Sequence, residues 1–186
     1  MLRRSLQILL FGLASLRCMA AAPEAATTEA PVRSYVNVQA SIVIHRPPSE
    51  VFAFVSDAEN DVHWRSEVVS MKNLTAPPHR VGTRTLEVAK VLGKQLETTT
   101  EITEFVPGER MARHTVTGLT PVVTARAVEP VADGARFTYQ LTADVTDVFL
   151  FRAFRPVLEW WTQRKVAGYL DSLKAHLEVP VGSNSP

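Results

Sequence analysis

The chain has 186 residues, of which 46% are hydrophobic and 21% are charged, and its formal net charge is +1. This length indicates one domain, and the composition excludes a disordered chain, a collagen-like repeat and a protein with several membrane-spanning helices. Three of the 20 basic residues and none of the 19 acidic ones lie in the first 20 positions. The remainder is slightly acidic and gives no reason to expect a nucleic-acid partner.

Residues 1–20 predict a signal peptide, because a short basic segment precedes the apolar run 8–16 and a patch of mostly small residues follows it. We therefore expect an exported protein, either periplasmic or secreted. A lipoprotein anchor at Cys18 is an alternative that Arg17 disfavours, since a small residue is wanted directly before the anchored cysteine. An organelle transit peptide, or a cytoplasmic protein, also stays open.

The rest of the chain divides into three parts. Residues 21–33 predict a flexible linker, because Ala, Thr, Glu and Pro dominate and no apolar period is present. Residues 34–178 form the predicted domain, and residues 179–186 a disordered tail. The only cysteine is Cys18, so the predicted domain has no disulfide and no cysteine-based metal site.

The domain begins with one strand and two short helices. Apolar and polar side chains alternate over residues 35–45, which predicts a half-buried strand. Pro48 suits the first turn of a helix, and residues 49–56 continue it with apolar side chains at helical spacing. Residues 59–65 predict a second short helix or turn, which includes Trp64.

Strands and turns fill the chain from residue 68 to residue 145, and a long helix follows. Because the turns are short, we expect antiparallel pairing. The final helix, predicted over residues 148–178, carries an apolar stripe in its second half. The sheet can cover its concave face only with this helix, so the order predicts an α+β domain. The clearest strands are residues 82–90, 95–105, 110–117, 121–128 and 135–145, and the stripe comprises Val166, Leu170, Leu173 and Leu177.

Five segments, in their order and spacing, carry a resemblance to a known family. They are Ile42–Phe54 with Asp57 and Trp64 behind it, Val81–Thr83, Thr103–Gly108 (TEFVPG), Glu129–Pro130 with Gly134, and Leu173–Glu178 (LKAHLE). Together they resemble the SRPBCC or START-like superfamily, in particular its polyketide cyclase/dehydrase and lipid-transport branch, over about residues 38–178.

The resemblance implies a helix-grip fold, in which a curved antiparallel sheet of about 6–7 strands wraps around a long C-terminal helix. Two short helices would follow the first strand, and an apolar cavity would lie between the sheet and the long helix. Members of this superfamily bind lipids, polyketides or other hydrophobic small molecules, and only some of them catalyse a reaction. The matching motifs are mainly structural and transfer no catalytic residue.

The residues themselves hold no catalytic or metal-binding motif. The glycines are isolated, the five histidines are scattered, and neither H-E-x-x-H nor G-x-S-x-G occurs. We therefore expect no metal and no cofactor, and whether the protein is an enzyme stays open. If it is one, the candidate acid/base groups are His114, Tyr139 and Glu159.

The implied cavity also defines the candidate ligand-binding residues. Trp64 is expected at the pocket opening, and the hydroxyl of Tyr139 needs a partner if it is buried. An ordinary packing role is the alternative for each candidate. The candidates are Trp64, His114, Tyr139, Phe154, Leu158 and Trp161.

Pro156 leaves two arrangements open for the start of the long helix. A straight helix would turn Arg155, Glu159 and Gln163 toward the cavity and expose the aromatic side chains. A bend near Pro156 would turn Phe154 and Trp161 inward and leave Arg155 and Glu159 as a surface pair. We favour the bend, because exposing all the aromatic side chains costs about 25 cal/mol per Å².

Three functions follow from these features. The first is a carrier that binds or sequesters a hydrophobic small molecule or lipid without catalysis. The second is a cyclase/dehydrase-like enzyme with acid/base groups in the pocket. The third is a protein-interaction or peripheral-membrane module that uses the aromatic segment 149–161. The oligomeric state is not predicted.

Overall fold

The computed structural model describes residues 33–91 and 93–179. The predicted signal peptide, the linker up to residue 32 and the tail from residue 180 lie outside the described residues. The elements are β1 (Tyr35–Ile44), α1 (Pro48–Ser56), the 3-10 helix η1 (Ala58–His63), β2 (Val68–Asn73), β3 (Arg84–Val91), β4 (Lys94–Val106), β5 (Arg110–Thr117), β6 (Val122–Val131), β7 (Gly134–Asp144), α2 (Phe149–Ala153) and α3 (Arg155–Glu178).

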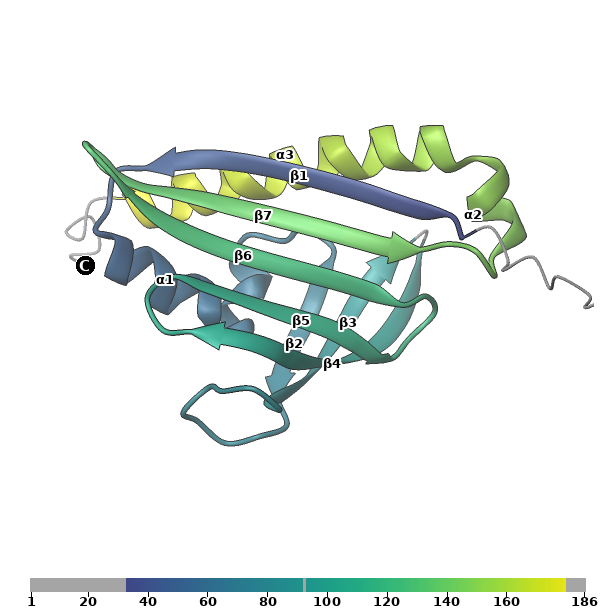
Figure 1. Ribbon diagram of the computed structural model, residues 1–186, viewed down its shortest axis with the longest axis horizontal. Coiled ribbons are helices and arrows are strands. Elements are labelled where there is room, and N and C mark those ends of the chain that lie inside the picture. Colours follow the sequence, from purple (N-terminus) through teal and green to yellow (C-terminus); the bar gives the residue numbers. More distant parts are fainter. Residues whose placement is uncertain (1–32, 92, 180–186) are drawn as a thin grey trace, which may run out of the picture. The chain divides into compact units, whose positions relative to one another are not determined.

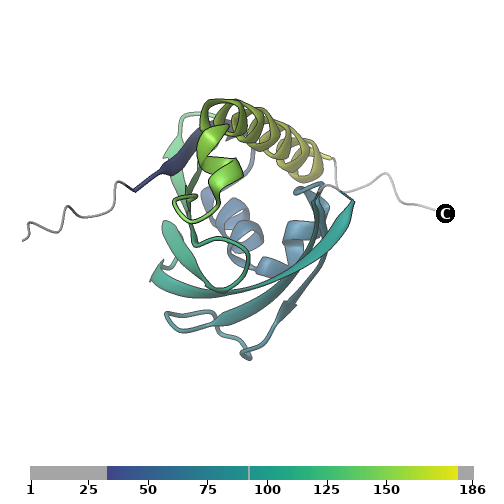
Figure 2. The same cartoon turned by 90° about the vertical axis from the view of Figure 1, so that its right-hand side faces the viewer.

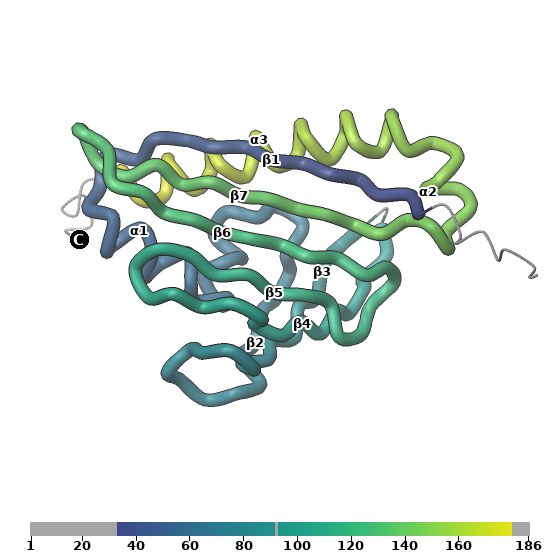
Figure 3. The backbone as a smooth tube through the Cα atoms, in the orientation of Figure 1, coloured from purple at the N-terminus to yellow at the C-terminus, as the bar shows by residue number. Residues whose placement is uncertain are grey.

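The strands form one antiparallel sheet in the order β1-β7-β6-β5-β4-β3-β2 (Figure 1). Consecutive strands from β2 to β7 pair with one another. Strand β1 instead pairs with β7, with Tyr35 opposite Asp144 at one end and Ile44 opposite Ala135 at the other. The sheet curls so that β2 and β3 run at a steep angle to β1 (Figure 3). This architecture confirms the predicted α+β helix-grip fold.

Helix α3 packs over the concave side of the sheet, along β1. Helices α1 and η1 lie inside the curl, at the end farther from α2 (Figure 2). The predicted stripe of α3 faces the core, where Val166, Leu170 and Leu173 are buried. Tyr169 is buried beside them, although the stripe did not include it. The sheet, α1 and α3 therefore share one hydrophobic core.

The polar row at the start of α3 lies along the free edge of β1. Gln163 donates to the Gln39 carbonyl at 3.0 Å, and the Asn37 amide donates to Glu159 at 3.4 Å. Arg155 donates to the Tyr35 carbonyl at 3.4 Å. An edge strand presents unpaired backbone groups, and this row satisfies several of them. The row thus neither lines the cavity nor forms an Arg155–Glu159 surface pair, which corrects the place that each of the two arrangements gave to these polar side chains.

The predicted bend occurs at Phe154, between α2 and α3, with Pro156 in the first turn of α3. Some of the apolar side chains near this break face a cavity, and others are exposed to solvent. Phe151, Leu158 and Trp161 line a cavity below the helix. Phe154 is exposed, which corrects its assignment to that cavity. Among the described residues, no helix is both long enough and apolar enough to span a membrane.

Candidate functional site

A cavity of about 290 Å³ lies between the inner face of the sheet and the first half of α3. One part of its wall is apolar, and the other part is polar and charged. The apolar wall includes Val36, Leu141, Ala143, Val145, Phe151 and Leu158, and the polar wall includes Arg65, Glu67, Glu87, Arg113, Arg126 and Lys165.

The cavity opens to solvent at the α2 end of the molecule. Leu119, in the turn between β5 and β6, is 63% exposed, and Trp161 of α3 is 41% exposed, although both line the cavity. The β5–β6 turn, the end of β7 and α2 all gather at this end (Figures 1 and 2). A ligand would therefore enter between α3 and the β5–β6 turn.

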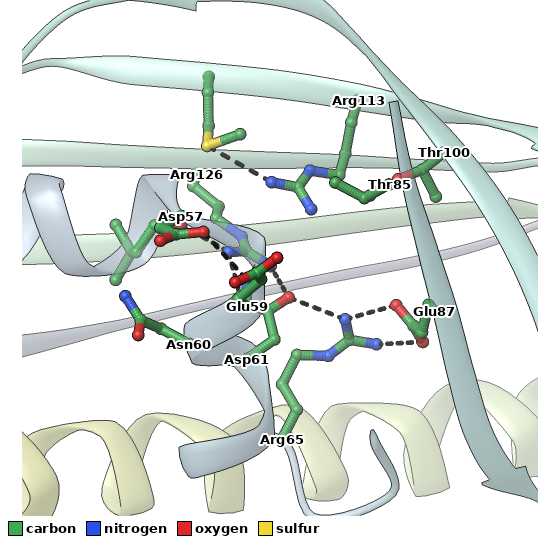
Figure 4. Close-up of polar contacts among 12 residues, drawn as sticks. Asp57, Glu59, Asn60, Asp61, Arg65, Thr85, Glu87, Thr100, Arg113 and Arg126 are labelled. Atoms are coloured by element: carbon green, nitrogen blue, oxygen red, sulfur yellow. Dashed lines mark hydrogen bonds and ion pairs between the residues drawn. The ribbon is translucent and has the colours of Figure 1, made fainter. Parts of the chain in front are cut away.

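Buried ion pairs lie beside the cavity, centred on Asp61 of η1 (Figure 4). Arg126 donates to both oxygens of Asp61 at 2.8 and 2.6 Å, and the two side chains are 2% and 0% exposed. Arg126 also donates to the Val55 carbonyl at 2.6 Å. Burial alone would raise the pKa of Asp61, but the guanidinium groups of Arg126, Arg65 and Arg113 together outweigh it and hold this pKa below its usual value. Asp61 is therefore ionised at neutral pH.

Arg65 connects Asp61 with the carboxylates of the cavity wall. It donates to Asp61 at 3.1 Å and to both oxygens of Glu87 at 2.8 and 3.0 Å. Glu67 lies 3.5 Å from Arg65 and 3.6 Å from Lys165 of α3. We call Asp61, Arg65, Glu67, Glu87, Arg126 and Lys165 the ion cluster.

Arg113 of β5 is a buried cation outside the ion cluster. It is 5% exposed and lines the cavity. Its one hydrogen bond within the described residues goes to the Met111 sulfur at 3.9 Å, and its Nε has no partner there. Burial and the nearby Arg126 lower the pKa of Arg113 to about 10, so it remains charged at neutral pH.

Trp64 and Tyr139 pack against each other beside the ion cluster. The Trp64 ring meets Tyr139 edge-on at 5.9 Å between centroids, and the Arg126 guanidinium lies 5.0 Å from the Trp64 centroid. Burial raises the pKa of the Tyr139 hydroxyl. Trp64 is fully buried in the core and does not line the cavity. This corrects its expected place at the opening.

The structure brings Tyr139, Leu158 and Trp161 together on the cavity wall, and their role as ligand contacts stays a prediction. The other sequence candidates lie elsewhere. His114 follows Arg113 on a strand whose side chains alternate, so it points to the opposite face, which corrects its assignment to the cavity. Glu159 is engaged at the edge of β1.

The charged residues of the wall were not identified from the sequence, because charged side chains are seldom buried in proteins. Arg113 lies two positions from Met111, and Arg126 lies two positions from Val128, so both share the inward phase of their strands. This alternation of inward and outward side chains is the sequence signal that could have placed both arginines inside the sheet. Among the described residues, no group of three His, Cys, Asp or Glu side chains could hold a metal ion.

The sequence of the chain matches the model of one protein family. The model of the family described as polyketide cyclase / dehydrase and lipid transport matches residues 35–178. The chain belongs to this family. The match spans every described strand and helix, and membership in the polyketide cyclase/dehydrase and lipid transport family is consistent with a cavity for a hydrophobic ligand. No curated protein matches the chain.

Solved structures share the fold of this family member. The protein TTHA0849 of Thermus thermophilus has a TM-score of 0.66 and 23% identity, over 76% of this chain and 96% of that one. A START superfamily protein of Mycobacterium smegmatis has a TM-score of 0.60 and 11% identity, over 76% and 97%. The di-domain ARO/CYC protein StfQ of the steffimycin biosynthetic pathway has a TM-score of 0.62 and 14% identity, over 77% and 51%.

Proposed function

We propose that the protein binds a hydrophobic small molecule or lipid in the cavity between the sheet and α3, as a carrier that performs no chemistry on it. The cavity itself carries this proposal. Its volume of about 290 Å³ is close to the lower end of the range for small-molecule sites. Its apolar wall would remove a hydrocarbon group from water, which is favourable by about 25 cal/mol per Å².

Similar proteins support the same class of ligand. The matching family is described by polyketide chemistry and lipid transport, and the structural neighbours include START and ARO/CYC proteins. Polyketides and lipids both present an extended hydrocarbon or aromatic surface that an apolar wall can cover. The predicted signal peptide would place such a carrier outside the cytoplasm.

The acid/base groups favour binding over catalysis. Of the three candidates His114, Tyr139 and Glu159, only Tyr139 lines the cavity. Glu87 on the same wall is held by two hydrogen bonds from Arg65. An acid/base mechanism needs two groups that converge on one ligand atom, and these candidates do not provide them.

Filling the cavity tests this function. Ala143→Phe adds a ring to the apolar wall, and Ala112→Phe adds the same ring to the opposite face of the sheet. We expect Ala143→Phe to weaken binding of the neutral fluorophore N-phenyl-1-naphthylamine at least about tenfold, since it removes more than about 1.4 kcal/mol of contact. Ala112→Phe should leave the affinity unchanged. Equal affinities in a fluorescence titration of the three full chains would contradict the proposal.

The exposed apolar side chains of α2 and α3 favour a second function, a membrane contact. Phe149 is 73% exposed and Trp160 is 64% exposed. The aromatic patch, as we call this surface, lies next to the residues of the same helices that line the cavity. Arg152 and Arg164 of the same helices are also exposed. The patch comprises Phe149, Leu150, Phe154, Val157 and Trp160.

We propose that the aromatic patch contacts an anionic membrane surface, from which the ligand enters the cavity. Aromatic side chains suit the membrane interface, and each arginine adds about 1 kcal/mol of attraction to anionic lipids. The neighbouring opening beside Trp161 would then face the lipid.

Vesicle co-sedimentation tests this contact. We expect the full chain to bind vesicles of phosphatidylglycerol and phosphatidylcholine more strongly than phosphatidylcholine alone, and the double variant Phe149→Ser/Trp160→Ser to lose most of that binding. The control Leu74→Ser/Val81→Ser removes two side chains of similar exposure away from the patch. All these chains retain residues 1–20, so binding by the leader cancels in the comparison. Equal binding by the two double variants would refute the contact.

A further inference from the structure

Arg113 is the one cation of the cavity wall that the described residues leave without a carboxylate. The neighbouring Arg126 and Arg65 both have one, because each donates to Asp61 and Arg65 donates to Glu87 as well. Lys165 faces Glu67. The guanidinium of Arg113 instead donates to the sulfur of Met111, at 3.9 Å. In Figure 4 its side chain lies apart from the Asp61 and Glu87 carboxylates.

The charges of this region do not balance. The ion cluster together with Arg113 contains four basic and three acidic side chains, so one positive charge is in excess. A buried ion without a partner is strongly unfavourable, and an unsatisfied buried polar group in a native structure requires an explanation. The excess charge lies in the wall of a cavity that opens to solvent, where a ligand can supply the missing anion.

The surroundings of Arg113 suit one end of an amphipathic ligand. Thr124, directly opposite on β6, and Thr100 both line the cavity near Arg113 and present hydroxyl groups. The apolar wall begins one strand farther on, at Leu141 of β7, the register partner of Thr124. A molecule with an anionic end at Arg113 and an apolar body along this wall would satisfy both parts.

We propose that Arg113 binds a carboxylate group of an otherwise apolar ligand, which makes the protein selective for acids over neutral molecules of the same length. This inference rests on the proposed binding function. A guanidinium presents a planar set of donors that matches a carboxylate with two parallel hydrogen bonds. In the closed part of the cavity, such a charge-assisted pair is stronger than in water.

Dodecanoate and 1-dodecanol test the selectivity, because they share a chain and differ in charge. Each displaces N-phenyl-1-naphthylamine from the full chain, and we expect wild type to prefer dodecanoate at least about tenfold. Arg113→Met should lose this preference by weakening dodecanoate binding while leaving 1-dodecanol binding within about twofold. Arg113→Lys keeps the charge and should restore part of the preference.

The melting temperature of the ligand-free protein separates a binding role from a structural one. Removal of an unpaired buried charge should keep or raise the stability, so Arg113→Met should melt at or above the wild-type temperature. A fall of about 5 °C or more would identify Arg113 as a structural residue and overturn the inference. Equal wild-type affinities for the two ligands would overturn it as well, with the cavity still binding. Failure of both ligands to bind would instead refute the proposed function itself.

Discussion

Asp61→Asn is expected to lower the free energy of unfolding by about 3–5 kcal/mol, because it breaks a buried ion pair by removing one partner. The asparagine amide keeps the shape of the side chain, but its NH2 group would face the donors of Arg126 or Arg65. Arg126 would retain the Val55 carbonyl and lose the one counter-ion that the described residues give it. For a chain of this length the loss corresponds to a fall in melting temperature of about 6–20 °C.

Glu104→Gln provides the matched control for Asp61→Asn. Glu104 accepts from Arg110 at 2.6 Å, the same distance as the shortest contact of Asp61 with Arg126, but both partners are about half exposed. An exposed pair contributes about 0–1 kcal/mol, so the control should change stability little. Denaturant unfolding of both variants gives the comparison. Similar losses of unfolding free energy in the two variants would mean that burial does not make the Asp61 ion pairs more stabilising than an exposed pair.

Gly134→Ala is expected to destabilise the fold by about 3 kcal/mol or more, through a clash and a strained backbone together. Gly134 begins β7 after a two-residue turn, and its φ of +140° is one that other residues rarely adopt. A Cβ there would overlap the carbonyl oxygen of Ile44 and lie 2.9 Å from the Cα of His45. These are backbone atoms at the end of β1, so relief requires that the β1 end move away from the β6–β7 hairpin.

Gly108→Ala separates the two causes. Gly108 has a φ of +82°, but a Cβ at this position has no atom within 4 Å. Strain alone should therefore reduce stability by about 1 kcal/mol. Thermal unfolding of both variants measures the difference. If Gly108→Ala were as damaging as Gly134→Ala, the close approach of the hairpin to β1 would contribute nothing.

The strands and the long helix were predictable because their side chains follow simple periods. Alternation over residues 35–45 and 135–145 matches β1 and β7, and the stripe from Val166 to Leu177 matches the buried face of α3. Periods do not reveal which distant strands pair. The β1–β7 pairing, which places β1 at the edge of the sheet beside α3, was therefore not predicted, and the resemblance implied only a curved antiparallel sheet around the long helix.

The candidate site was less predictable, for two physical reasons. Charged side chains are normally exposed, so composition and charge give no sign that Arg113 and Arg126 are buried at inward strand positions. The polar row of α3 could not be assigned because its partners are backbone groups of β1, an edge strand 120 or more residues away. Tyr139 was found because its apolar neighbours on β7 fix its phase.

The location of a bound probe tests the binding cavity most directly. Intermolecular nuclear Overhauser effects can be measured between 1-dodecanol and methyl-labelled full-length protein. We predict cross-peaks from the alkyl chain to methyl groups of Leu141, Ala143, Val145 and Leu158, which line the apolar wall. Cross-peaks confined to Leu150 and Val157 of the aromatic patch, or to Ala125 and Ala127 on the outer face, would place the ligand elsewhere and contradict the proposed binding in the cavity.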